Sequence, residues 1–299
     1  MTNAINVALI LTLLGLPLTA WSQDSETAPS VKTTPLTGNL YLLQGRGGNV
    51  VASVGEDGIL LIDTDYGEYA TAYHGALKSL ADGEVKASYV INTHWHGDHV
   101  GSNAYWGERG AVIMAQSNVY ARMSTRQEMK AFDRVVEPSP KVALPVVTYG
   151  DAIALHFNGD DVEVQHAPRS HTDGDSVVYF SAHNVVHMGD LFFKDRYPFV
   201  DLGSGGNVLS FTDSVARVLA RVDDDTLIVP GHGGGVANRA DLQRYYDMLV
   251  SSTATVKEKL AKGMSVAAIA AEGVGDDWVA WDSGFISTEA WVGSIAASL

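Results

Sequence analysis

The sequence contains no cysteine. This absence excludes disulfide bonds, a thiolate nucleophile, iron–sulfur clusters and any zinc site with a cysteine ligand. Basic residues are also scarce: 20 Lys and Arg stand against 35 Asp and Glu, which gives a formal net charge of −15 at pH 7. Contact with phosphate or anionic lipid needs a basic surface, so the charge argues against a nucleic-acid partner and against docking on an anionic membrane.

No apolar run is long enough to cross a bilayer, which takes about 20 residues, so we predict no stable membrane insertion. The N-terminal run, residues 7–16, is too short and is followed by the small residues Ala20 and Ser22. This order is typical of a signal peptide with a cleavage site after Ser22. We therefore predict a signal peptide over residues 1–22 and a periplasmic or secreted mature protein. Because residues 1–6 contain no Lys or Arg, an N-terminal helix or anchor is the alternative.

The rest of the chain alternates between clusters of strands and helices. Short β-rich runs predict strands over residues 39–43, 49–54, 59–62, 87–92, 111–115, 161–166, 176–180, 185–188 and 227–229. Apolar residues at helical spacing and capping residues predict helices over residues 66–80, 117–129, 212–222 and 241–262. Residues 23–37 are mostly polar and are interpreted as a leader of the mature chain. Because no stretch is typical of an interdomain linker, we predict one domain over residues 23–299, with sheets covered by helices.

The densest polar cluster is the sequence His-Trp-His-Gly-Asp-His, which begins at His94 directly after a predicted strand. In an extended segment residues two apart point the same way, so His94 and His96 can reach one ion together. Gly97 permits a sharp turn, after which Asp98 and His99 can face a second point nearby. Imidazole nitrogen and carboxylate oxygen are both zinc ligands, at about 2.0–2.2 Å. A solvated polar loop is the alternative, but it explains three histidines and an aspartate beside a glycine poorly.

Three further candidate ligands follow strand ends or turns that contain glycine. They are His171, Asp190 and His232. Taken singly, a histidine near glycine is more often structural or solvated. Loops on a rigid scaffold are nevertheless where binding sites tend to be built. Together with the first cluster these residues make seven candidate ligands, which is enough for two metal ions.

The order of these motifs is similar to that of a known family. His-x-His-x-Asp-His, then a single His, then Gly-Asp, then Pro-Gly-His resembles the metallo-β-lactamase superfamily, from about Asn39 to about His232. The sequence Leu-Ile-Asp that ends at Asp63 matches the early strand of that family. The resemblance implies an α+β fold, a four-layer αββα sandwich with the metals at one edge between the sheets.

The resemblance also assigns the candidate ligands. It implies one metal on His94, His96 and His171, a second metal on Asp98, His99 and His232, and a bridge between them from Asp190. Two Zn²⁺ per chain are the default expectation, although a set of His and carboxylate ligands also suits iron or manganese. Asp63, Thr93 and Ser170 are candidates to hydrogen-bond the ligand imidazoles and fix their tautomers. Ordinary capping or turn bonding is an equal alternative for these three.

This ligand set predicts hydrolysis. Two metals about 3.5–4 Å apart can share a water, lower its pKa and orient it as a nucleophile. Asp98 is the candidate catalytic residue, because it can orient this hydroxide or relay a proton. We therefore predict an exported hydrolase of a small-molecule amide or ester, with a β-lactam as the leading substrate. Asp190 stands where the cysteine-containing β-lactamases carry Cys, and the resemblance links a bridging Asp to glyoxalase II and lactonases.

Several alternatives remain open from the sequence. One is a lactonase, thioesterase or other ester hydrolase of the same superfamily. A mononuclear-iron dioxygenase and a non-catalytic periplasmic relay or binding protein are alternatives outside the hydrolases. The sequence also leaves the oligomeric state open. Candidates to line the substrate pocket are Trp95, Arg169, Tyr197 and Phe199, and the glycine-rich residues 45–49 are a candidate flap.

Overall fold

The computed structural model describes residue 1 and residues 28–81, 83 and 85–299. The predicted signal peptide and its cleavage after Ser22 lie outside the described part of the chain, apart from residue 1. No helix in the described ranges is long and apolar enough to cross a membrane. Part of the predicted polar leader is ordered in a sheet, because Lys32–Pro35 form strand β1 and pair antiparallel with the next strand.

The first sheet has seven strands in the order β1-β2-β3-β4-β5-β6-β9. They are β1, β2 (Leu40–Gln44), β3 (Val50–Gly55), β4 (Gly58–Ile62), β5 (Ala87–Asn92), β6 (Val112–Gln116) and β9 (Val147–Tyr149). Strands β1 to β4 pair antiparallel, whereas β4, β5, β6 and β9 are parallel neighbours. The carboxyl ends of β4 and β5 therefore meet at one edge of the sheet, where Asp63 and the His94 cluster begin.

The second sheet has five strands in the order β10-β11-β12-β13-β14. They are β10 (Ala152–Phe157), β11 (Asp160–His166), β12 (Ser176–Phe180), β13 (Val185–His187) and β14 (Leu227–Val229). All neighbours are antiparallel except β13 and β14, which are parallel. One hydrophobic cluster joins side chains of both sheets, including Leu60, Val164 and Val229, so the sheets pack face to face.

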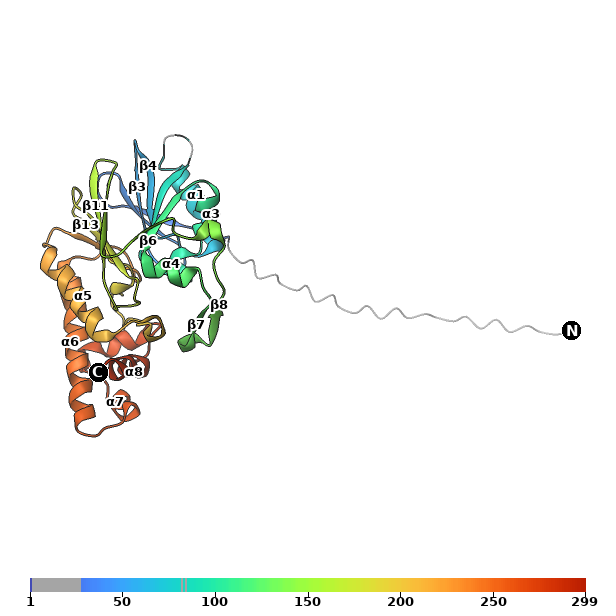
Figure 1. Ribbon diagram of the computed structural model, residues 1–299. Helices are drawn as coiled ribbons and strands as arrows, with labels where there is room; N and C mark the ends of the chain where they lie inside the picture. The colour runs from blue at the N-terminus through green and yellow to red at the C-terminus, as the bar shows by residue number, and fades with distance from the viewer. Residues whose placement is uncertain (2–27, 82, 84) are drawn as a thin grey trace.

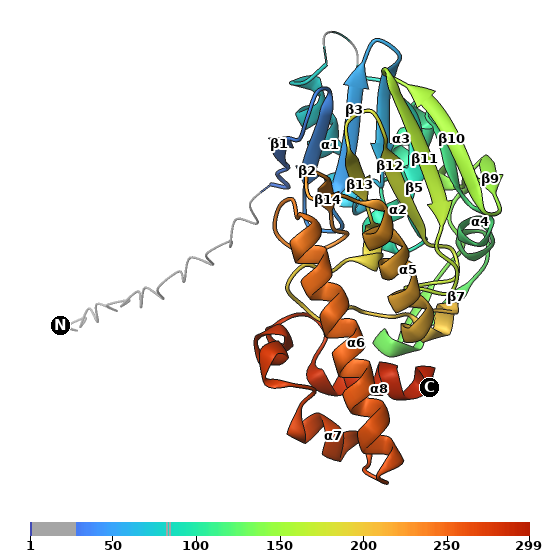
Figure 2. The same ribbon diagram turned by 90° about the vertical axis from the view of Figure 1, so that its left-hand side faces the viewer.

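Helices cover the outer faces of the two sheets, as Figures 1 and 2 show. Helices α1 (Ala70–Lys78) and α3 (Asn103–Glu108) cover the first sheet, and their residues Tyr73 and Trp106 share a core cluster with it. Helices α5 (Val208–Arg221) and α6 (Arg239–Ala261) cover the second sheet. The predicted α+β fold, a four-layer αββα sandwich, is confirmed.

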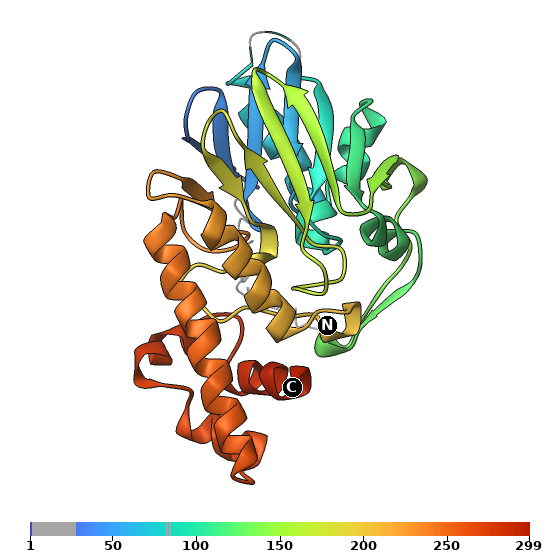
Figure 3. The ribbon, with the colours of Figure 1, turned by 60° about the vertical axis from the view of Figure 1, so that its left-hand side comes forward.

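The C-terminal segment extends below the sandwich in Figure 3. It contains the lower part of α6, then α7 (Val266–Glu272), the 3₁₀ helix η6 (Asp276–Ser283) and α8 (Thr288–Ser298). Buried residues of α5, α6 and α8 belong to one hydrophobic cluster that also reaches the second sheet. The β-hairpin of β7 (Gln127–Met129) and β8 (Arg134–Val136) lies next to this segment.

The predicted helix over residues 117–129 is too long. The structure has helix α4 over Ser117–Met123, followed by strand β7. The hydroxyls of Ser124 and Thr125 both donate to the carbonyl of Ala121, which competes with continued helical bonding. The capping side chain is also not Ser117, because Gln116 accepts the hydrogen bond from Asn118 N.

Candidate metal centre

The first group of candidate ligands gathers where β5, β12 and β13 approach one edge of the sandwich. His94, His96, His171 and Asp190 are all buried, and their ligand atoms lie within 4.8 Å of one another. His96 Nδ1 lies 3.1 Å from His94 Nε2 and 2.9 Å from His171 Nε2. One ring nitrogen carries at most one proton, so His96 cannot donate to both neighbours at once. A shared cation accounts for the three converging nitrogens better than hydrogen bonding does.

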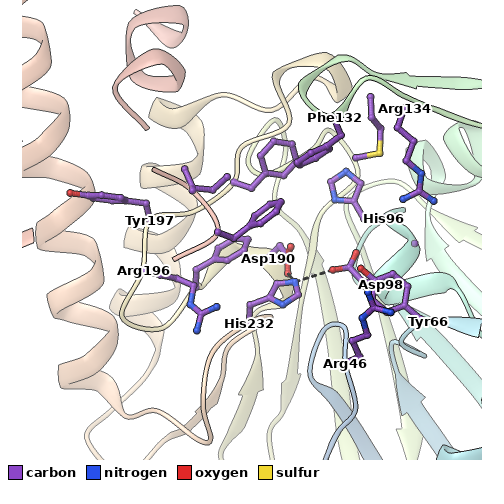
Figure 4. Close-up of a pocket in the computed structure, with 16 residues that line it drawn as sticks. Arg46, Tyr66, His96, Asp98, Phe132, Arg134, Asp190, Arg196, Tyr197 and His232 are labelled. Carbon is purple, nitrogen blue, oxygen red and sulfur yellow. Dashed lines mark ion pairs between the residues drawn. The ribbon is translucent and has the colours of Figure 1, made fainter. Parts of the chain in front are cut away.

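The second group consists of Asp98, His99 and His232. His232 Nε2 lies 3.2 Å from Asp98 Oδ2 and 3.4 Å from His99 Nε2. Asp98 and His99 belong to the short helix α2 (Gly97–Val100), which follows the extended N-cap residue His96. The turn at Gly97 thus separates the two groups, as the sequence predicts. Figure 4 shows Asp98, Asp190 and His232 facing one another at the base of a pocket.

Asp190 lies between the two groups. Its Oδ1 is 3.1 Å from His99 Nε2 and 3.4 Å from His232 Nε2. Its Oδ2 is 3.4 Å from His171 Nε2 and 3.8 Å from His94 Nε2. Within the described part of the chain, buried Oδ1 has no hydrogen-bond partner. Each oxygen therefore faces a different group, which is the geometry that a bridging carboxylate needs.

The spacing of the ligand atoms fits metal ions. Ligands at about 2.0–2.1 Å in a tetrahedral zinc site lie about 3.4 Å apart. The distances from His96 Nδ1 and from Asp190 to the neighbouring imidazoles, 2.9–3.8 Å, bracket this value. The seven predicted ligands thus form a cluster able to bind metal ions, although their individual roles as ligands remain predictions.

The other ring nitrogens are held by hydrogen bonds that aim the free nitrogens at the centre. His99 Nδ1 donates to Asp63 Oδ2 at 2.7 Å. Asp63 also accepts from Thr93 N and Thr93 Oγ1, both at 2.7 Å. The Thr93 hydroxyl in turn accepts from His94 Nδ1 at 3.1 Å. Two of the three predicted supporting residues, Asp63 and Thr93, therefore contact ligand imidazoles.

Ser170, the third predicted supporting residue, does not contact a ligand imidazole in the described structure. Its hydroxyl shares a 2.7 Å hydrogen bond with Ser214 Oγ on helix α5. Its carbonyl accepts from Asn207 N at 3.0 Å, at the start of the same helix. Ser170 therefore anchors the loop before His171 to α5, and the expected hydrogen bond to an imidazole is wrong.

Two supporting groups were not predicted from the sequence. His96 Nε2 donates to Asp201 Oδ2 at 3.0 Å, and His171 Nδ1 donates to the carbonyl of Phe199 at 2.7 Å. Burial raises the pKa of Asp201, but hydrogen bonds from His96 and Ser204 outweigh it and bring the pKa to about 2. Asp201 is therefore a carboxylate at neutral pH. No motif marks it, because it lies in a loop far from His96 in sequence.

The two groups differ in the charge that they favour. Burial lowers the pKa of His94 well below its usual range and that of His171 to about 4, so both imidazoles stay neutral, as metal ligands must be. Burial by itself lowers the pKa of His99 and His232. The nearby carboxylates, chiefly that of Asp190, raise it by more, so both pKa values lie above the usual range. The carboxylates near the second group thus stabilise positive charge there, which protons or a metal ion can supply.

Glycines let the backbone approach the centre closely. A Cβ added at Gly48 would overlap the ring of His99, and one at Gly231 would overlap Asp190 Oδ1. The loop before Gly48 is held in place, because Asp65 accepts from Arg46 N at 3.0 Å and from Gly47 N at 2.8 Å. These hydrogen bonds hold the predicted flap against Asp65, and Arg46 of this segment lines the cavity.

A cavity of about 440 Å³ opens onto the centre, and Asp98, Asp190 and His232 lie at its base (Figure 4). Tyr197 and Phe199 line it, as predicted. The other two predicted lining residues do not: Trp95 packs in a small core cluster with Ala115 and Val119, and Arg169 is not among the lining residues.

Comparison with known proteins agrees with this geometry. Residues 33–232 match the family model of the metallo-β-lactamase superfamily, so the chain belongs to that superfamily, whose members are mostly metal-dependent hydrolases. The sequence is 22% identical over 173 residues to metallo-β-lactamase type 2 of Bacteroides fragilis, covering 56% of this chain and 63% of that one. It is 28% identical over 191 residues to hydroxyacylglutathione hydrolase of Erythrobacter litoralis, covering 60% and 64%.

Among solved structures, the fold is similar to the stereoselective inverting sec-alkylsulfatase Pisa1 from Pseudomonas sp.. The TM-score is 0.67 at 16% identity, and the match covers 89% of this chain and 49% of that chain. This likeness shows the fold alone. The chain thus spans about half the length of this structure and less than two thirds of the two hydrolases.

Asp201→Asn should weaken metal binding or activity by roughly 10–100-fold, the usual effect of losing a partner of a ligand imidazole. The single amide oxygen cannot accept from both His96 Nε2 and Ser204 N, so one of the two hydrogen bonds that hold this contact is lost. Metal titration of the purified variant measures the change. Asp213→Asn is the matched control, because Asp213 is an exposed aspartate of α5 and belongs to neither group of candidate ligands. Equal metal affinity in both variants would contradict a role for Asp201.

Proposed function

We propose that this chain is a hydrolase with two metal ions, two Zn²⁺ by default, that cleaves an amide or ester bond of a small molecule. The position of Asp190 carries the proposal, because its two oxygens face two separate groups of buried ligands. A site for a single ion would not require a carboxylate whose two oxygens face separate groups of ligands. Membership of a superfamily of mostly metal-dependent hydrolases supports the same conclusion.

The residues around the cavity have different proposed roles. A bound metal pair supplies a water nucleophile of lowered pKa and polarises the bond to be cleaved. Asp98 is the more accessible carboxylate, with 22% of its side chain exposed against 5% for Asp190. It also lines the cavity, so its carboxylate oxygens can accept a proton from the nucleophile and orient it. Asp190 is buried, and its part is to hold the two groups together.

A β-lactam amide is the leading substrate class, since a relative carries the name metallo-β-lactamase. The second candidate is an ester, lactone or thioester. The observation that favours it is Asp190 itself, a carboxylate where the cysteine-containing β-lactamases carry Cys. Another relative carries the name hydroxyacylglutathione hydrolase, which fits this second class.

A hydrolysis screen on metal-quantified protein tests the proposal. The full chain is purified without chelator, its metal content is measured, and it is assayed with β-lactams, lactones, thioesters and phosphodiesters. We expect about two metal ions per chain, turnover in one class, loss of turnover with a chelator and recovery with Zn²⁺. One iron and no zinc would favour a dioxygenase. Full metal occupancy with no turnover in any class would favour a relay or binding protein and overturn the proposal.

We further propose that the mature protein is exported to the periplasm or secreted. The short apolar run over residues 7–16, followed by Ala20 and Ser22, motivates this proposal. Intact-mass measurement of the protein from the extracytoplasmic fraction tests it, and the expected first residue is Gln23. A cytoplasmic protein that still begins at Met1 or Thr2 would contradict it.

A further inference from the structure

Three phenylalanines, Phe132, Phe199 and Phe285, form one wall of the cavity, which we call the aromatic roof. Phe132, at the tip of the β7–β8 hairpin, lies 4.9 Å from Phe199 and 5.6 Å from Phe285 between ring centroids. Phe285, in the C-terminal segment after η6, stacks on Phe132 at an angle of 27°. All three rings line the cavity, yet Phe132 and Phe285 are 39% and 69% exposed. Such exposed aromatic surface beside a pocket is typical of a ligand-binding wall.

The roof lies next to two of the candidate ligands. The ring of Phe199 lies 6.0 Å from that of His96 and 5.7 Å from that of His171. Met129 of β7 and Ile286 also line the cavity beside the three phenylalanines. An apolar group bound under the roof would therefore place a neighbouring polar bond close to the metal centre.

Two arginines lie on opposite sides of this cavity in Figure 4. Arg134 begins strand β8 and is exposed, whereas Arg196 is half-buried. Within the described ranges neither guanidinium has an ion-pair or hydrogen-bond partner, whereas the third arginine of the cavity, Arg46, pairs with Glu68. A half-buried guanidinium has lost part of its hydration, so an anion that binds it gains charge-assisted hydrogen bonds. This is notable in a chain of net charge −15, which as a whole repels anions.

We propose that the substrate is an organic anion with an aryl or alkyl body. Its apolar body lies under Phe132, Phe199 and Phe285, and its anionic group pairs with Arg196. Arg134, which is exposed and hydrated, contributes attraction at the mouth of the cavity and less binding energy. This inference rests on the proposed function, because it takes the cavity as the place where the substrate binds.

One part of the proposed binding surface lies outside the family match. The matched region ends at residue 232, whereas Phe285 and Ile286 belong to the C-terminal segment. The candidate metal ligands lie within the matched region, as do Arg196 and two of the three roof phenylalanines, and Phe285 lies beyond it. The C-terminal segment thus adds Phe285 and Ile286 to a cavity that the matched region otherwise forms.

Calorimetric titration of the metal-loaded full chain tests the proposal without requiring turnover. The probes are 4-phenylbutanoate, its neutral analogue 4-phenylbutanamide, and acetate, which has the charge without the apolar body. We expect 4-phenylbutanoate to bind roughly 10–100-fold more tightly than the amide, the value of one charge-assisted hydrogen-bonded contact. Acetate should bind more weakly than 4-phenylbutanoate, because it leaves the aromatic roof uncovered.

Variants test the contact with the anionic group and the contact with the apolar body separately. Arg196→Gln should remove most of the preference for the anion, Arg196→Lys should keep part of it, and Arg134→Gln should reduce it by less than about fivefold. Phe285→Ala should weaken both phenyl probes alike. Arg221→Gln is the control, because Arg221 pairs with Glu163 at 2.7 Å and does not line the cavity. Metal content and circular dichroism check that each variant is intact.

The outcomes for this inference and for the hydrolase proposal are distinct. If 4-phenylbutanoate keeps its full preference in Arg196→Gln, the carboxylate binds the metals and not the arginine, and this inference is wrong. If the anion preference depends on Arg196 but the screen finds no turnover, the cavity binds organic anions and the hydrolase proposal fails. A protein that hydrolyses neutral and anionic substrates equally well would overturn this inference alone.

Discussion

Asp190→Asn should lower kcat/KM by more than about 100-fold and remove metal from at least one of the two groups of ligands. Loss of a partner of a ligand costs roughly 10–100-fold, and loss of a ligand should cost more. The variant has one acceptor oxygen in place of two, and its neutral amide nitrogen would face imidazole nitrogens on one side. Those nitrogens lie 3.1–3.4 Å from Oδ1 and 3.4–3.8 Å from Oδ2, so neither orientation of the amide serves both groups.

Asp160→Asn is the matched control for this variant. Asp160 is also a buried aspartate with a histidine partner, because it accepts from His183 Nδ1 at 2.5 Å and from Ala182 N at 2.8 Å. Neither Asp160 nor His183 belongs to a group of candidate ligands. We expect the control to keep its metal and its kcat/KM, measured with the substrate that the screen identifies. An Asp190→Asn protein with two metals and near-normal turnover would remove the bridging role of Asp190.

The sequence predicts which candidate ligands come together, because these residues follow strands closely. His94 follows β5 by two positions and His232 follows β14 closely, and short apolar runs that end in polar clusters are visible in the sequence. The supporting pair Asp63 and Thr93 could be predicted for the same reason, since both follow parallel neighbouring strands. These are local patterns, and the sheet brings their ends together.

The remaining parts of the site depend on contacts that local patterns do not encode. Asp201 reaches His96 across 105 positions of sequence, from a loop without a motif. Phe132 lies on a hairpin whose first strand, β7, falls within the predicted helix over residues 117–129, and it stacks on Phe285 from the C-terminal segment. Such contacts arise from tertiary packing, so of the roof only Phe199 was predicted, and neither Phe132 and Phe285 nor the two arginines could be.

Trp291→Ala should lower the free energy of unfolding by about 3–5 kcal/mol, the usual cost of removing a buried aromatic side chain. Trp291 in α8 has no exposed surface, and its Nε1 donates to Ser252 Oγ of α6 at 3.0 Å. Its ring stacks on Tyr197 at 6.1 Å between centroids, and Tyr197 lines the cavity. The substitution therefore loosens both the C-terminal helices and one wall of the site. We expect the melting temperature to fall by roughly 5–10 °C.

The same experiment tests whether residues 23–299 form one domain. Buried residues of α5, α6 and α8 share one hydrophobic cluster, so the loss of Trp291 should shift a single cooperative transition of the whole chain. Thermal unfolding followed by circular dichroism and by calorimetry measures it. Val279→Ala is the control in the same segment, because Val279 is 68% exposed and should change stability by less than about 0.5 kcal/mol. Two separate transitions, of which only one shifts in Trp291→Ala, would show that the C-terminal helices unfold independently of the sandwich. Phe285 would then be held against Phe132 by their ring contact and not by a shared core.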